Sequence, residues 1–561
     1  MARGMLKCWQ RPIGPDGRPS RCLMPTLRDL LRDLPYVRAQ GDLNQPVSGI
    51  SYDSRLVKAG DLFVALPGFH TDGSIFIPQA VAAGAAAVLT QRSDAPLPEG
   101  VPALLVPDAR RALADLSAAF YGHPARHLRV VGVTGTDGKT TTTYLASAVL
   151  EGMGHRTGLV TTVDVKVGDR IWRNETQHTT PEPVEVQGLL REMVDAGVDY
   201  AVLESSSHAL ALDRLLHCEF DVAVFTNLSP EHLNFHGSME SYLQAKARLF
   251  RLMDESTCKG LEKVAVLNAD DPHSRHLLAE TGARVVWYGI EGARAGGLAT
   301  GSKLRPHGDG GVRGQADGPV PGTWGSELGS RFWAVRAADL RLLPVGSRFR
   351  LVTPVGSMEV ESHLSGRFNV LNWLAAAAVG LSQGASLEQI RQAMALVDSV
   401  PGRMQRIDCG QPFAVVVDFA HTPQALETVL RTLRPITPGR IIVLFGMAGE
   451  RDPANRPEMG RVAARLADFA LFTSDDPRFE DPVEIARQIA SGARAEGWRD
   501  GEHYIEIADR EEAIREAFLR ARAGDTVVLA GKGHENRQVI GSRLVPWNDA
   551  DVARRLLSEL A

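Results

Sequence analysis

The stretch Val130-Val131-Gly132-Val133-Thr134-Gly135-Thr136-Asp137-Gly138-Lys139-Thr140-Thr141-Thr142-Thr143 decides the fold of this chain. It runs from β-branched residues, which favour a strand, through a glycine-rich turn into a segment expected to be helical. Glycines allow backbone N–H groups to converge on an anion, and the amino end of a helix adds partial positive charge. Lys139 supplies a full charge, and the Thr140 hydroxyl suits Mg²⁺. The stretch therefore predicts a phosphate-binding loop, with ATP as the first ligand to consider.

The glycine spacing differs from the general P-loop pattern, which has a glycine where Val133 stands. Gly132 and Gly135 flank that position instead. A glycine turn between a strand and a helix is also compatible with plain packing, but Lys139 followed by Thr140 favours phosphate. The residues predicted to bind the nucleotide here are Gly135, Thr136, Asp137, Gly138, Lys139, Thr140 and Thr141.

Composition excludes several classes of protein. The chain has 561 residues, 44% hydrophobic and 23% charged, as expected for a soluble globular protein of about three or four domains. A net charge of -5 argues against nonspecific nucleic-acid binding. The five cysteines are scattered without a CxxC pair, which fits a reducing compartment and argues against a zinc cluster. No apolar run of about 18 residues and no apolar signal core is present, so we expect a cytoplasmic protein with no membrane partner.

Changes of pattern along the chain predict three α/β domains, at 24–126, 127–399 and 400–561. Residues 1–23 are rich in Arg, Pro and Gly, and we expect them to be disordered or to precede a true start at Met24. Residues 291–330 are dominated by glycine and polar residues and predict a flexible insertion with no catalytic role.

The central domain is expected to contain a parallel sheet, because short apolar strands alternate with helices. In the first domain, the sequence predicts an amphipathic segment with helical spacing at Leu27–Leu34, several short strands and an alanine-rich helix over 78–86. Further elements are predicted strands at 130–133, 200–204, 222–227 and 264–268, antiparallel strands within 332–362, an alanine-rich helix after Asn369, and a hinge at Val400-Pro401-Gly402.

Polar residues follow two of these strands, where ligands of a parallel sheet bind. Glu204 ends one strand and is a candidate Mg²⁺ ligand, although a lone glutamate there is more often a salt-bridge or capping residue. Asn227 and His232 follow the next strand and are available to a metal or phosphate, whereas a lone histidine is usually structural. Lys246 lies one helical turn from Tyr242 and from Phe250, and by itself indicates only a solvated lysine.

The segments GVTGTDGKTTT, ESSSHAL, FTNLSPEHLNFHGSMESY and AKARLF resemble the central domain of the Mur ligase family. The resemblance extends from about Ile50 to Asn548, with the motifs in order. It implies a three-domain architecture with a UDP-sugar domain, a central P-loop-type sheet and a Rossmann-like C-terminal domain. It also implies an ATP-dependent ligase of peptidoglycan synthesis that adds a diamino acid to UDP-N-acetylmuramoyl-L-alanyl-D-glutamate, and we expect it to act as a monomer.

The resemblance also implies the metal and nucleotide ligands. Thr140 and Glu204 would hold one Mg²⁺ and His232 a second, while Lys246 matches the family's carbamylated lysine. Addition of CO₂ turns an ammonium that repels a metal into an anionic oxygen ligand suited to Mg²⁺. For ATP, Asn227 joins the loop, Asn372 points toward the nucleotide, Arg403 approaches the phosphates and Asp418 holds the ribose, with Phe419 where tyrosine is usual. Without the family, Arg403 could simply hold the hinge and Asn372 cap its helix.

Substrate contacts implied by the resemblance fall in all three domains. Ser54, Phe69, His70 and Thr71 would bind the UDP-sugar, although Ser74 stands where the family commonly has histidine. Thr179, Thr180, Ser206, His208 and Arg214 match positions that hold the muramoyl-dipeptide. Arg451, Asp475, Asp476, Pro477, Arg478, Gly531 and Glu535 match the pocket for the incoming amino acid.

The amine added is predicted from the segment Asp475-Asp476-Pro477-Arg478. Relatives specific for meso-diaminopimelate typically read Asp-Asn-Pro-Arg, and Arg478 would pair with the distal carboxylate of that substrate. Asp476 replaces the Asn and adds a negative charge, which a terminal amine would favour. meso-Diaminopimelate is therefore slightly favoured over L-lysine or L-ornithine.

Two other functions share features with this sequence. A folylpolyglutamate synthase should lack the Asp53-Ser54-Arg55 segment and the diamino-acid pocket, and a non-catalytic Mur-like binding protein should have lost Lys139, Glu204, His232 or Lys246. Both segments and all four residues are present. The implied reaction forms an acyl phosphate on the D-glutamate carboxylate, which the amine held by the third domain then attacks.

Overall fold

The computed structural model describes residues 24–34, 37–68, 71–97, 99–174, 176, 178–291, 332–343 and 346–560. Residues 1–23, Phe69, His70 and almost all of the predicted insertion at 291–330 lie outside the described residues. The chain forms two compact units, one made of residues up to Val335 with Leu374–Ser386, the other of Arg336–Trp373 and Leu387 onward. The predicted domain limits near 126 and 400 are not tested by this division and stay a prediction.

The first part of the chain forms a small α/β layer around a five-stranded sheet of order β1-β5-β4-β3-β2. Strands β2 to β5 are parallel, and β1 is antiparallel to β5. The helix predicted over 78–86 is shorter, because the chain turns at Gly84 with φ +97°. The elements are α1 (Leu27–Leu30), β1 (Arg38–Gln40), β2 (Gly49–Ser51), β3 (Asp61–Val64), α2 (Ile77–Ala82), β4 (Ala87–Thr90), β5 (Ala103–Leu105) and α3 (Ala109–Phe120), with 3-10 turns at Leu31–Asp33, Gly73–Phe76 and Pro124–His127.

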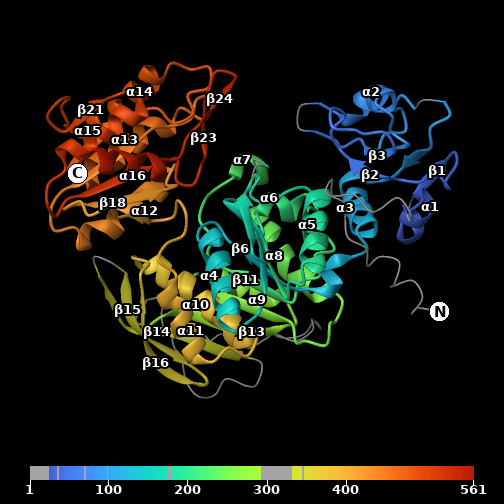
Figure 1. Cartoon of the computed structure of the whole chain (residues 1–561), viewed down its shortest axis with the longest axis horizontal. Coiled ribbons are helices and arrows are strands. Elements are labelled where there is room, and N and C mark those ends of the chain that lie inside the picture. The colour runs from blue at the N-terminus through green and yellow to red at the C-terminus, as the bar shows by residue number, and fades with distance from the viewer. Residues whose placement is uncertain are drawn as a thin grey trace, which may run out of the picture. The chain divides into compact units, whose positions relative to one another are not determined.

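The largest sheet has the order β16-β15-β14-β13-β12-β11-β6-β10-β7-β8-β9, and its parallel centre contains the strand that leads into the glycine loop (Figure 1). Strand β6 lies between β10 and β11, both parallel to it. The parallel sheet predicted for this region is therefore confirmed. The elements are β6 (Arg129–Thr134), α4 (Lys139–Gly152), β7 (Thr157–Val160), β8 (Asp164–Val167), β9 (Arg170–Arg173), α5 (Pro183–Asp195), β10 (Tyr200–Glu204), α6 (Ser207–Ala211), β11 (Val222–Phe225), α7 (Leu233–His236), α8 (Met239–Glu255), β12 (Val264–Asn268), α9 (Ser274–Ala279) and β13 (Arg284–Ile290).

The antiparallel strands expected within 332–362 are also present. They are β14 (Phe332–Leu342), β15 (Ser347–Thr353) and β16 (Gly356–Ser362), and helices α10 (Arg367–Ser382) and α11 (Leu387–Leu396) follow them. Strand β15 pairs with β14 and with β16 in antiparallel register. In β15, buried and more exposed residues alternate from Ser347 to Thr353, as one covered face of a sheet requires.

The C-terminal part forms a six-stranded sheet of order β17-β18-β22-β19-β20-β21 with helices on both faces. Strands β18 to β21 are parallel, and β17 is antiparallel to β18. Along β19, Ile441, Val443 and Phe445 join one apolar cluster and Ile442 and Leu444 another, so both faces are buried as in doubly wound folds. The elements are β17 (Gln405–Ile407), β18 (Ala414–Asp418), α12 (Pro423–Leu433), a 3-10 turn at Arg434–Ile436, β19 (Ile441–Phe445), α13 (Asn455–Leu466), β20 (Phe469–Phe472), α14 (Pro482–Ala495), β21 (Tyr504–Glu506), α15 (Arg510–Arg520), β22 (Thr526–Ala530), β23 (Arg537–Ile540), β24 (Arg543–Pro546) and α16 (Asp549–Leu560).

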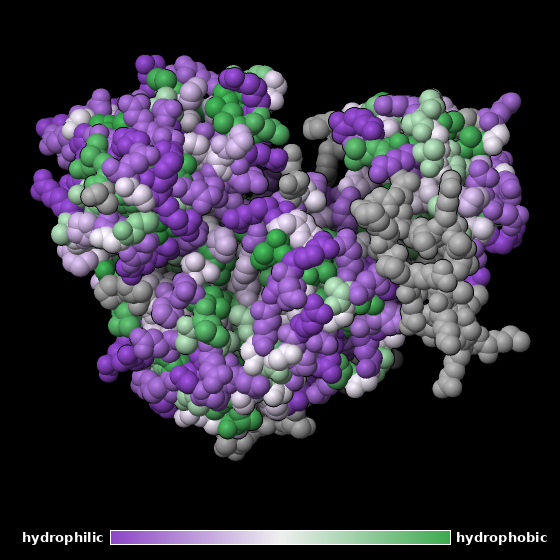
Figure 2. Space-filling model, in the orientation of Figure 1, coloured by the Kyte–Doolittle hydropathy of each residue, from purple (hydrophilic) through white to green (hydrophobic). Residues whose placement is uncertain are grey.

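The surface seen in Figure 2 is mostly hydrophilic, with apolar residues scattered between polar ones. In the described part of the chain, no helix has the length and apolar character needed to span a bilayer. The apolar side chains lie instead in the clusters beneath the sheets.

A buried ion pair joins α15 to α16. Arg510 donates to both carboxylate oxygens of Asp549, at 2.8 and 2.7 Å, and both side chains are 0% exposed. Arg510 also donates to the carbonyl oxygen of Ser474 (3.2 Å), two residues after β20, and to that of Ala530 (2.9 Å), the last residue of β22.

Arg510→Met is expected to lower the free energy of unfolding by about 3–5 kcal/mol, because Asp549 would keep a buried charge without its partner. Urea unfolding of the variant measures the loss. Arg515→Met is the matched control, since Arg515 and Glu559 pair at 2.8 Å between the same two helices with both side chains partly exposed. That pair should contribute less than about 1 kcal/mol. Equal losses in the two variants would contradict the expectation.

Candidate active site

The glycine-rich loop connects β6 to α4. Gly135 has φ +149° and Gly138 has φ +81° at the position before the helix. A Cβ atom on Gly135 would overlap the hydroxyl of Thr226, so this position requires glycine. No described side chain caps the amino end of α4, whose first-turn N–H groups are thus left for a ligand. The loop has the backbone arrangement expected of an anion cradle.

The segment after β11 fixes the shape of this loop. The Thr136 N–H donates to the carbonyl of Asn227 (2.8 Å), and the Asp137 N–H donates to the Asn227 side-chain oxygen (2.9 Å). Thr226 donates its hydroxyl to the Asp137 carbonyl at 2.6 Å. Asn227, predicted as a nucleotide ligand, therefore supports the loop in this structure.

Gly135→Ala is expected to weaken nucleotide binding strongly while leaving the sheet folded, because the new methyl group would displace the loop from Thr226. The Kd for ATP, measured by calorimetry, should rise by at least about 100-fold if the loop carries the main phosphate contacts. Gly154→Ala, at an exposed turn with open space around its Cβ, is the control. Unchanged ATP affinity in Gly135→Ala would contradict the assignment.

Glu204 lies where the sequence predicts a metal ligand. Its carboxylate accepts a hydrogen bond from the Thr140 hydroxyl (3.0 Å) and one from the Thr162 N–H (2.9 Å). The side chain is buried, at 2% exposure, and among the described residues it forms no ion pair. The salt-bridge alternative is therefore not supported. A buried carboxylate beside a threonine hydroxyl suits a hard cation.

Lys246 is buried in α8 instead of being solvated. Its ammonium nitrogen donates to the carbonyl of Gly135 at 2.6 Å and lies 4.2 Å from the centre of the Tyr242 ring. Burial, and next the charge of Lys139, hold the pKa of Lys246 well below its ordinary value. No described carboxylate pairs with it. Lys139 itself donates to the Thr136 carbonyl at 2.7 Å, so both lysines are bonded to the phosphate loop.

His232 precedes α7 with φ +55°, within a group of aromatic rings. The rings of His208 and His232 are 4.8 Å apart, and His232 lies 6.3 Å from Tyr242. The Tyr242 hydroxyl is 3.2 Å from that of Thr136 in the loop. Burial, followed by the charge of His232, lowers the pKa of His208 to about 4, so that ring is neutral near pH 7. The structure thus brings His232 and Lys246 to the same loop.

The residues matched to the muramoyl-dipeptide lie beside Glu204. The Thr180 hydroxyl donates to the Glu204 carbonyl (2.7 Å), and Ser206 is 3.2 Å from the same hydroxyl. Arg214 donates to the Thr180 carbonyl (3.1 Å) and pairs with Glu182 at 2.6 Å, while its buried Nε has no protein partner. Thr179 is half-buried next to Thr180.

Only part of the predicted UDP-sugar site is described. Ser54 donates its hydroxyl to Gln79 at 3.2 Å, and the Thr71 carbonyl accepts the Gly68 N–H at 3.2 Å. Phe69 and His70 lie outside the described residues. The N–H of Ser74 donates to the Asp72 carboxylate at 2.8 Å.

In the second unit, the predicted amino-acid residues gather around Lys532. Its ammonium lies 3.4 Å from Asp475, 2.8 Å from Asp476 and 2.5 Å from Glu535, and its side chain is 0% exposed. We call these four residues the Lys532 cluster. A Cβ on Gly531 would press against the Asp475 carboxylate, and Gly531 has φ +99°, so glycine is required there too.

Arg478 adjoins the Lys532 cluster through the peptide of Val539. The Val539 N–H donates to Asp476 (3.0 Å), and its carbonyl accepts from the Arg478 N–H (2.9 Å). Arg478 has φ +52° and lies 3.6 Å from Glu450, while its buried Nε has no protein partner. Pro477 lies between the two, and Arg451 is exposed.

The residues predicted to reach ATP from the second unit have internal contacts. Asp418 accepts the Met404 N–H (2.7 Å) and the Ala420 N–H (2.9 Å), which holds the hinge. Arg403 lies over the Phe419 ring at 4.9 Å, and its buried Nε has no protein partner. Asn372 donates to Asn369 at 3.2 Å within α10, not at its amino end. Roles of these residues toward ATP stay predictions.

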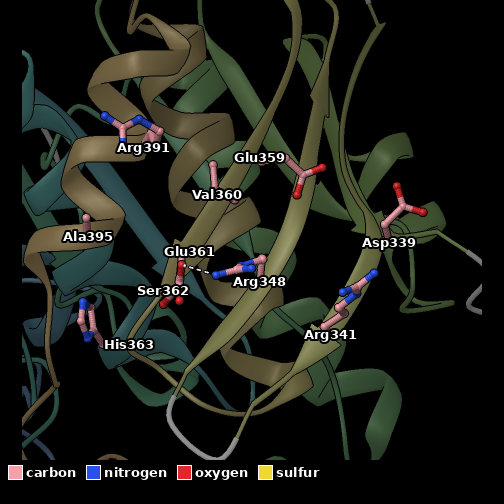
Figure 3. Close-up of a pocket in the computed structure, with 10 residues that line it drawn as sticks. All are labelled: Asp339, Arg341, Arg348, Glu359, Val360, Glu361, Ser362, His363, Arg391 and Ala395. Carbon is pink, nitrogen blue, oxygen red and sulfur yellow. Dashed lines mark hydrogen bonds and ion pairs between the residues drawn. The ribbon is translucent and has the colours of Figure 1, made fainter.

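A cavity of about 750 Å³ lies elsewhere, on β14 to β16 and α11 (Figure 3). Arg348 of β15 and Glu361 of β16 are cross-strand partners on its wall and pair at 3.0 Å. Arg391, which lines the cavity from α11, pairs with Glu388 at 2.5 Å. None of the predicted site residues lines this cavity.

Sequence reasoning missed Lys532, Val539 and Arg510. Lys532 had one available signal, since it is the only lysine after position 303 in an arginine-rich chain. Val539 acts through its backbone, which no residue type reveals. Arg510 supports the structure through bonds to Asp549 and Ala530, which are distant from it in the sequence.

A central parallel strand, a glycine loop with a lysine at a helix start and a buried acidic neighbour define an α/β nucleotide-binding protein. Three family models match successive segments: "Mur ligase family, catalytic domain" at 46–121, "Mur ligase middle domain" at 133–312 and "Mur ligase, glutamate ligase domain" at 402–533. The chain belongs to the Mur ligase family.

Individual relatives agree over nearly the whole chain. UDP-N-acetylmuramyl-tripeptide synthetase of Roseiflexus sp. (strain RS-1) is 46% identical, covering 95% of this chain and 99% of the relative. UDP-N-acetylmuramoyl-L-alanyl-D-glutamate–2,6-diaminopimelate ligase of Geobacillus kaustophilus (strain HTA426) is 43% identical, with the same coverage of 95% and 99%. A solved structure of a ligase with that second name is 30% identical, with a TM-score of 0.61, covering 96% of this chain and 99% of the other. The three-domain fold predicted from the motifs is confirmed.

Proposed function

We propose that this chain is an ATP-dependent ligase that joins 2,6-diaminopimelate to the D-glutamate of UDP-N-acetylmuramoyl-L-alanyl-D-glutamate in peptidoglycan synthesis. Relatives 37–43% identical over 95% of this chain carry the name of that ligase. The phosphate loop provides for ATP, and the turn at Arg478 provides for diaminopimelate, the amine given in that name. The observation that carries the choice of amine is the unpartnered Nε of Arg478.

The reaction has two steps. A carboxylate oxygen of D-glutamate attacks the γ-phosphorus of ATP, the bond to the β-phosphate oxygen breaks, and ADP leaves. The uncharged amine of the diamino acid then attacks the acyl carbon, phosphate leaves with the bonding electron pair, and the nitrogen loses one proton. Lys139 and the first-turn N–H groups of α4 offset the negative charge that crowds the phosphate oxygens.

The donor set at the loop fits Mg²⁺. Thr140 and the unpaired buried carboxylate of Glu204 would hold one ion, and His232 with a carbamylated Lys246 a second. When bound, the ions would offset charge on the transferring phosphoryl group. Glu204 without a paired cation is the observation that supports this assignment among the described residues.

Carbamylation of Lys246 is supported by the lowered pKa of its amine. Only a neutral amine attacks CO₂, and burial holds the pKa of Lys246 well below its ordinary value. The reaction forms an N–C bond and releases one proton, leaving a carbamate. The product is an anion, so it would attract the metal ions that a lysine ammonium would repel.

Arg478 supports diaminopimelate over L-lysine and L-ornithine. A guanidinium with an unsatisfied buried donor is suited to a carboxylate, and diaminopimelate has one at its distal end whereas the other two amines have none. Asp476 was the reason to consider L-lysine, but one of its oxygens already accepts from Lys532 and from Val539. The opposing argument is therefore weaker in the structure than in the sequence.

The test is release of phosphate from ATP in the presence of UDP-N-acetylmuramoyl-L-alanyl-D-glutamate, with meso-diaminopimelate, L-lysine and L-ornithine offered separately. We expect release to depend on meso-diaminopimelate and a tripeptide product of matching mass. Dependence on L-lysine or L-ornithine alone would replace the amine in the proposal. Release that no amine stimulates would overturn the proposal.

A further inference from the structure

We propose that Lys532 is a positioning residue that neutralises Asp476 in place, so that this aspartate acts as a fixed acceptor and does not attract a substrate ammonium. The inference rests on the proposed function and names the residue that preserves its preference for a distal carboxylate. It concerns the departure Asp476, which stands where meso-diaminopimelate enzymes typically have Asn.

The geometry of the Lys532 cluster matches a primary ammonium. A lysine ammonium has three N–H donors, and Lys532 has three carboxylates within ion-pair distance, at 2.5, 2.8 and 3.4 Å. The carboxylate oxygens of Asp475, Asp476 and Glu535 lie within 4.8 Å of one another, close enough to repel strongly without a cation. Among the described residues, Lys532 is the one cation that pairs with them.

One oxygen of Asp476 is committed to the protein. Its Oδ1 accepts both from Lys532 at 2.8 Å and from the Val539 N–H at 3.0 Å. An Asn side-chain oxygen could accept the same two bonds, because neither requires a charged acceptor. The Asp476 carboxylate therefore accepts the same two hydrogen bonds that an asparagine would accept. Its negative charge is balanced by the Lys532 ammonium beside it.

The excess of negative charge in the Lys532 cluster affects the pKa values of Asp475 and Glu535. One ammonium cannot balance three anions, and burial, ahead of the neighbouring charges, raises the pKa of Asp475 and brings that of Glu535 to about 7. Burial alone would lower the pKa of Lys532, but Asp475, Glu535 and Asp476 outweigh it and raise the pKa. Lys532 therefore stays charged while Glu535 shares a proton near neutral pH.

The residue type supports a specific requirement for an ammonium. After position 303 every other basic side chain of this chain is Arg or His. A planar guanidinium directs its donors in a fork, whereas an ammonium directs three N–H groups to separate carboxylates around one point. A chain that uses arginine almost throughout has lysine where three carboxylates converge.

The consequence concerns the distal end of the amino acid. With Asp476 neutralised, Arg478 is the charged group of this turn with a free buried donor, and it favours a carboxylate. Without Lys532, the carboxylate of Asp476 would repel that carboxylate and attract the ammonium of L-lysine. Lys532 thus keeps the Asp476 version of the motif selective.

The experiment compares wild type, D476N, K532M and K532M/D476N for KM and kcat with meso-diaminopimelate and with L-lysine. D476N should change the KM for meso-diaminopimelate by less than about threefold, because the amide keeps both hydrogen bonds. K532M should raise that KM by at least about tenfold and lower the preference over L-lysine, with a smaller effect on kcat. K532M/D476N should recover most of the preference.

A merely structural role for Lys532 predicts a different pattern, in which K532M is not rescued by D476N and the KM for ATP changes as well. That result would overturn the inference, as would a tenfold or larger rise of the KM for meso-diaminopimelate in D476N. If K532M does not fold by circular dichroism, D476N alone decides. R440M is the control, because Arg440 pairs with buried Asp525 before β19 and β22, away from the Lys532 cluster in sequence and contacts. Its amine preference should equal that of wild type.

Failure of this inference and failure of the proposed function give different results. If wild type shows no amine-dependent phosphate release, the proposed function fails and the inference with it. If wild type depends on meso-diaminopimelate but the D476N and K532M results are reversed, only the inference fails.

Discussion

Lys246→Ala is expected to lower amine-dependent phosphate release by about 10²- to 10³-fold, the range found when one group that stabilises transition-state charge is removed. Two roles of this side chain would be lost together. It holds the Gly135 carbonyl of the phosphate loop at 2.6 Å, and its carbamate would contribute the anionic ligand. The measurement is kcat with saturating ATP, UDP-linked dipeptide and diamino acid.

Addition of a short carboxylic acid separates these roles. Formate or acetate can enter the space of the deleted side chain and supply an anionic oxygen, so partial recovery of kcat is expected if the carbamate is the active form. Lys166→Ala, in β8 outside the site, is the control and should need no acid. Full activity of Lys246→Ala without added acid would contradict the assigned role, and absence of rescue would contradict the carbamate.

Arg478→Met is expected to raise the KM for meso-diaminopimelate by about 100-fold, which corresponds to about 3 kcal/mol for a charge-assisted contact whose partner would be left unpaired. The KM for ATP should change little, because Arg478 is bonded to β23 and not to the phosphate loop. Activity with L-lysine, which has no distal carboxylate, should be unaffected or slightly higher.

Arg487→Met is the matched control for Arg478. Arg487 is an exposed arginine of α14 that pairs with Glu484 at 3.7 Å, and its loss should change no KM. An unchanged KM for meso-diaminopimelate in Arg478→Met would show that another group recognises the distal carboxylate.

The order of elements could be predicted from the sequence because apolar strands of four or five residues alternate with longer helices. The limits predicted for β10 and β12 agree with the structure, since polar residues end both strands. Strand β11 ends two residues earlier than predicted, at Phe225, because the Thr226 hydroxyl and the Asn227 side chain bond to the phosphate loop. Helix α2 ends at Ala82, earlier than predicted, because the chain turns at Gly84. The local pattern of apolar and polar residues does not reveal hydrogen bonds between distant parts of the chain, so it could not predict where β11 ends.

The site could be predicted where its chemistry is local. The Thr140–Glu204 contact was expected from two strands ending at the same edge, and it is present. The burial of Lys246 could not be predicted, because helical spacing places it near Tyr242 and Phe250 but says nothing of Gly135, a partner 111 positions away. For the same reason the sequence indicates only a negative charge at Asp476, since its two donors come from Lys532, which follows β22, and from Val539 in β23.

The buried Arg510 has a consequence for how amine selectivity can change in this family. Its guanidinium holds the carbonyls of Ser474 and Ala530, the residues immediately before Asp475 and Gly531. One side chain that also supports the fold therefore holds the start of both loops that carry the proposed amino-acid ligands. Altered selectivity is therefore expected from substitutions at Asp476, Arg478 or Lys532, whereas loss of Arg510 would destabilise the domain itself.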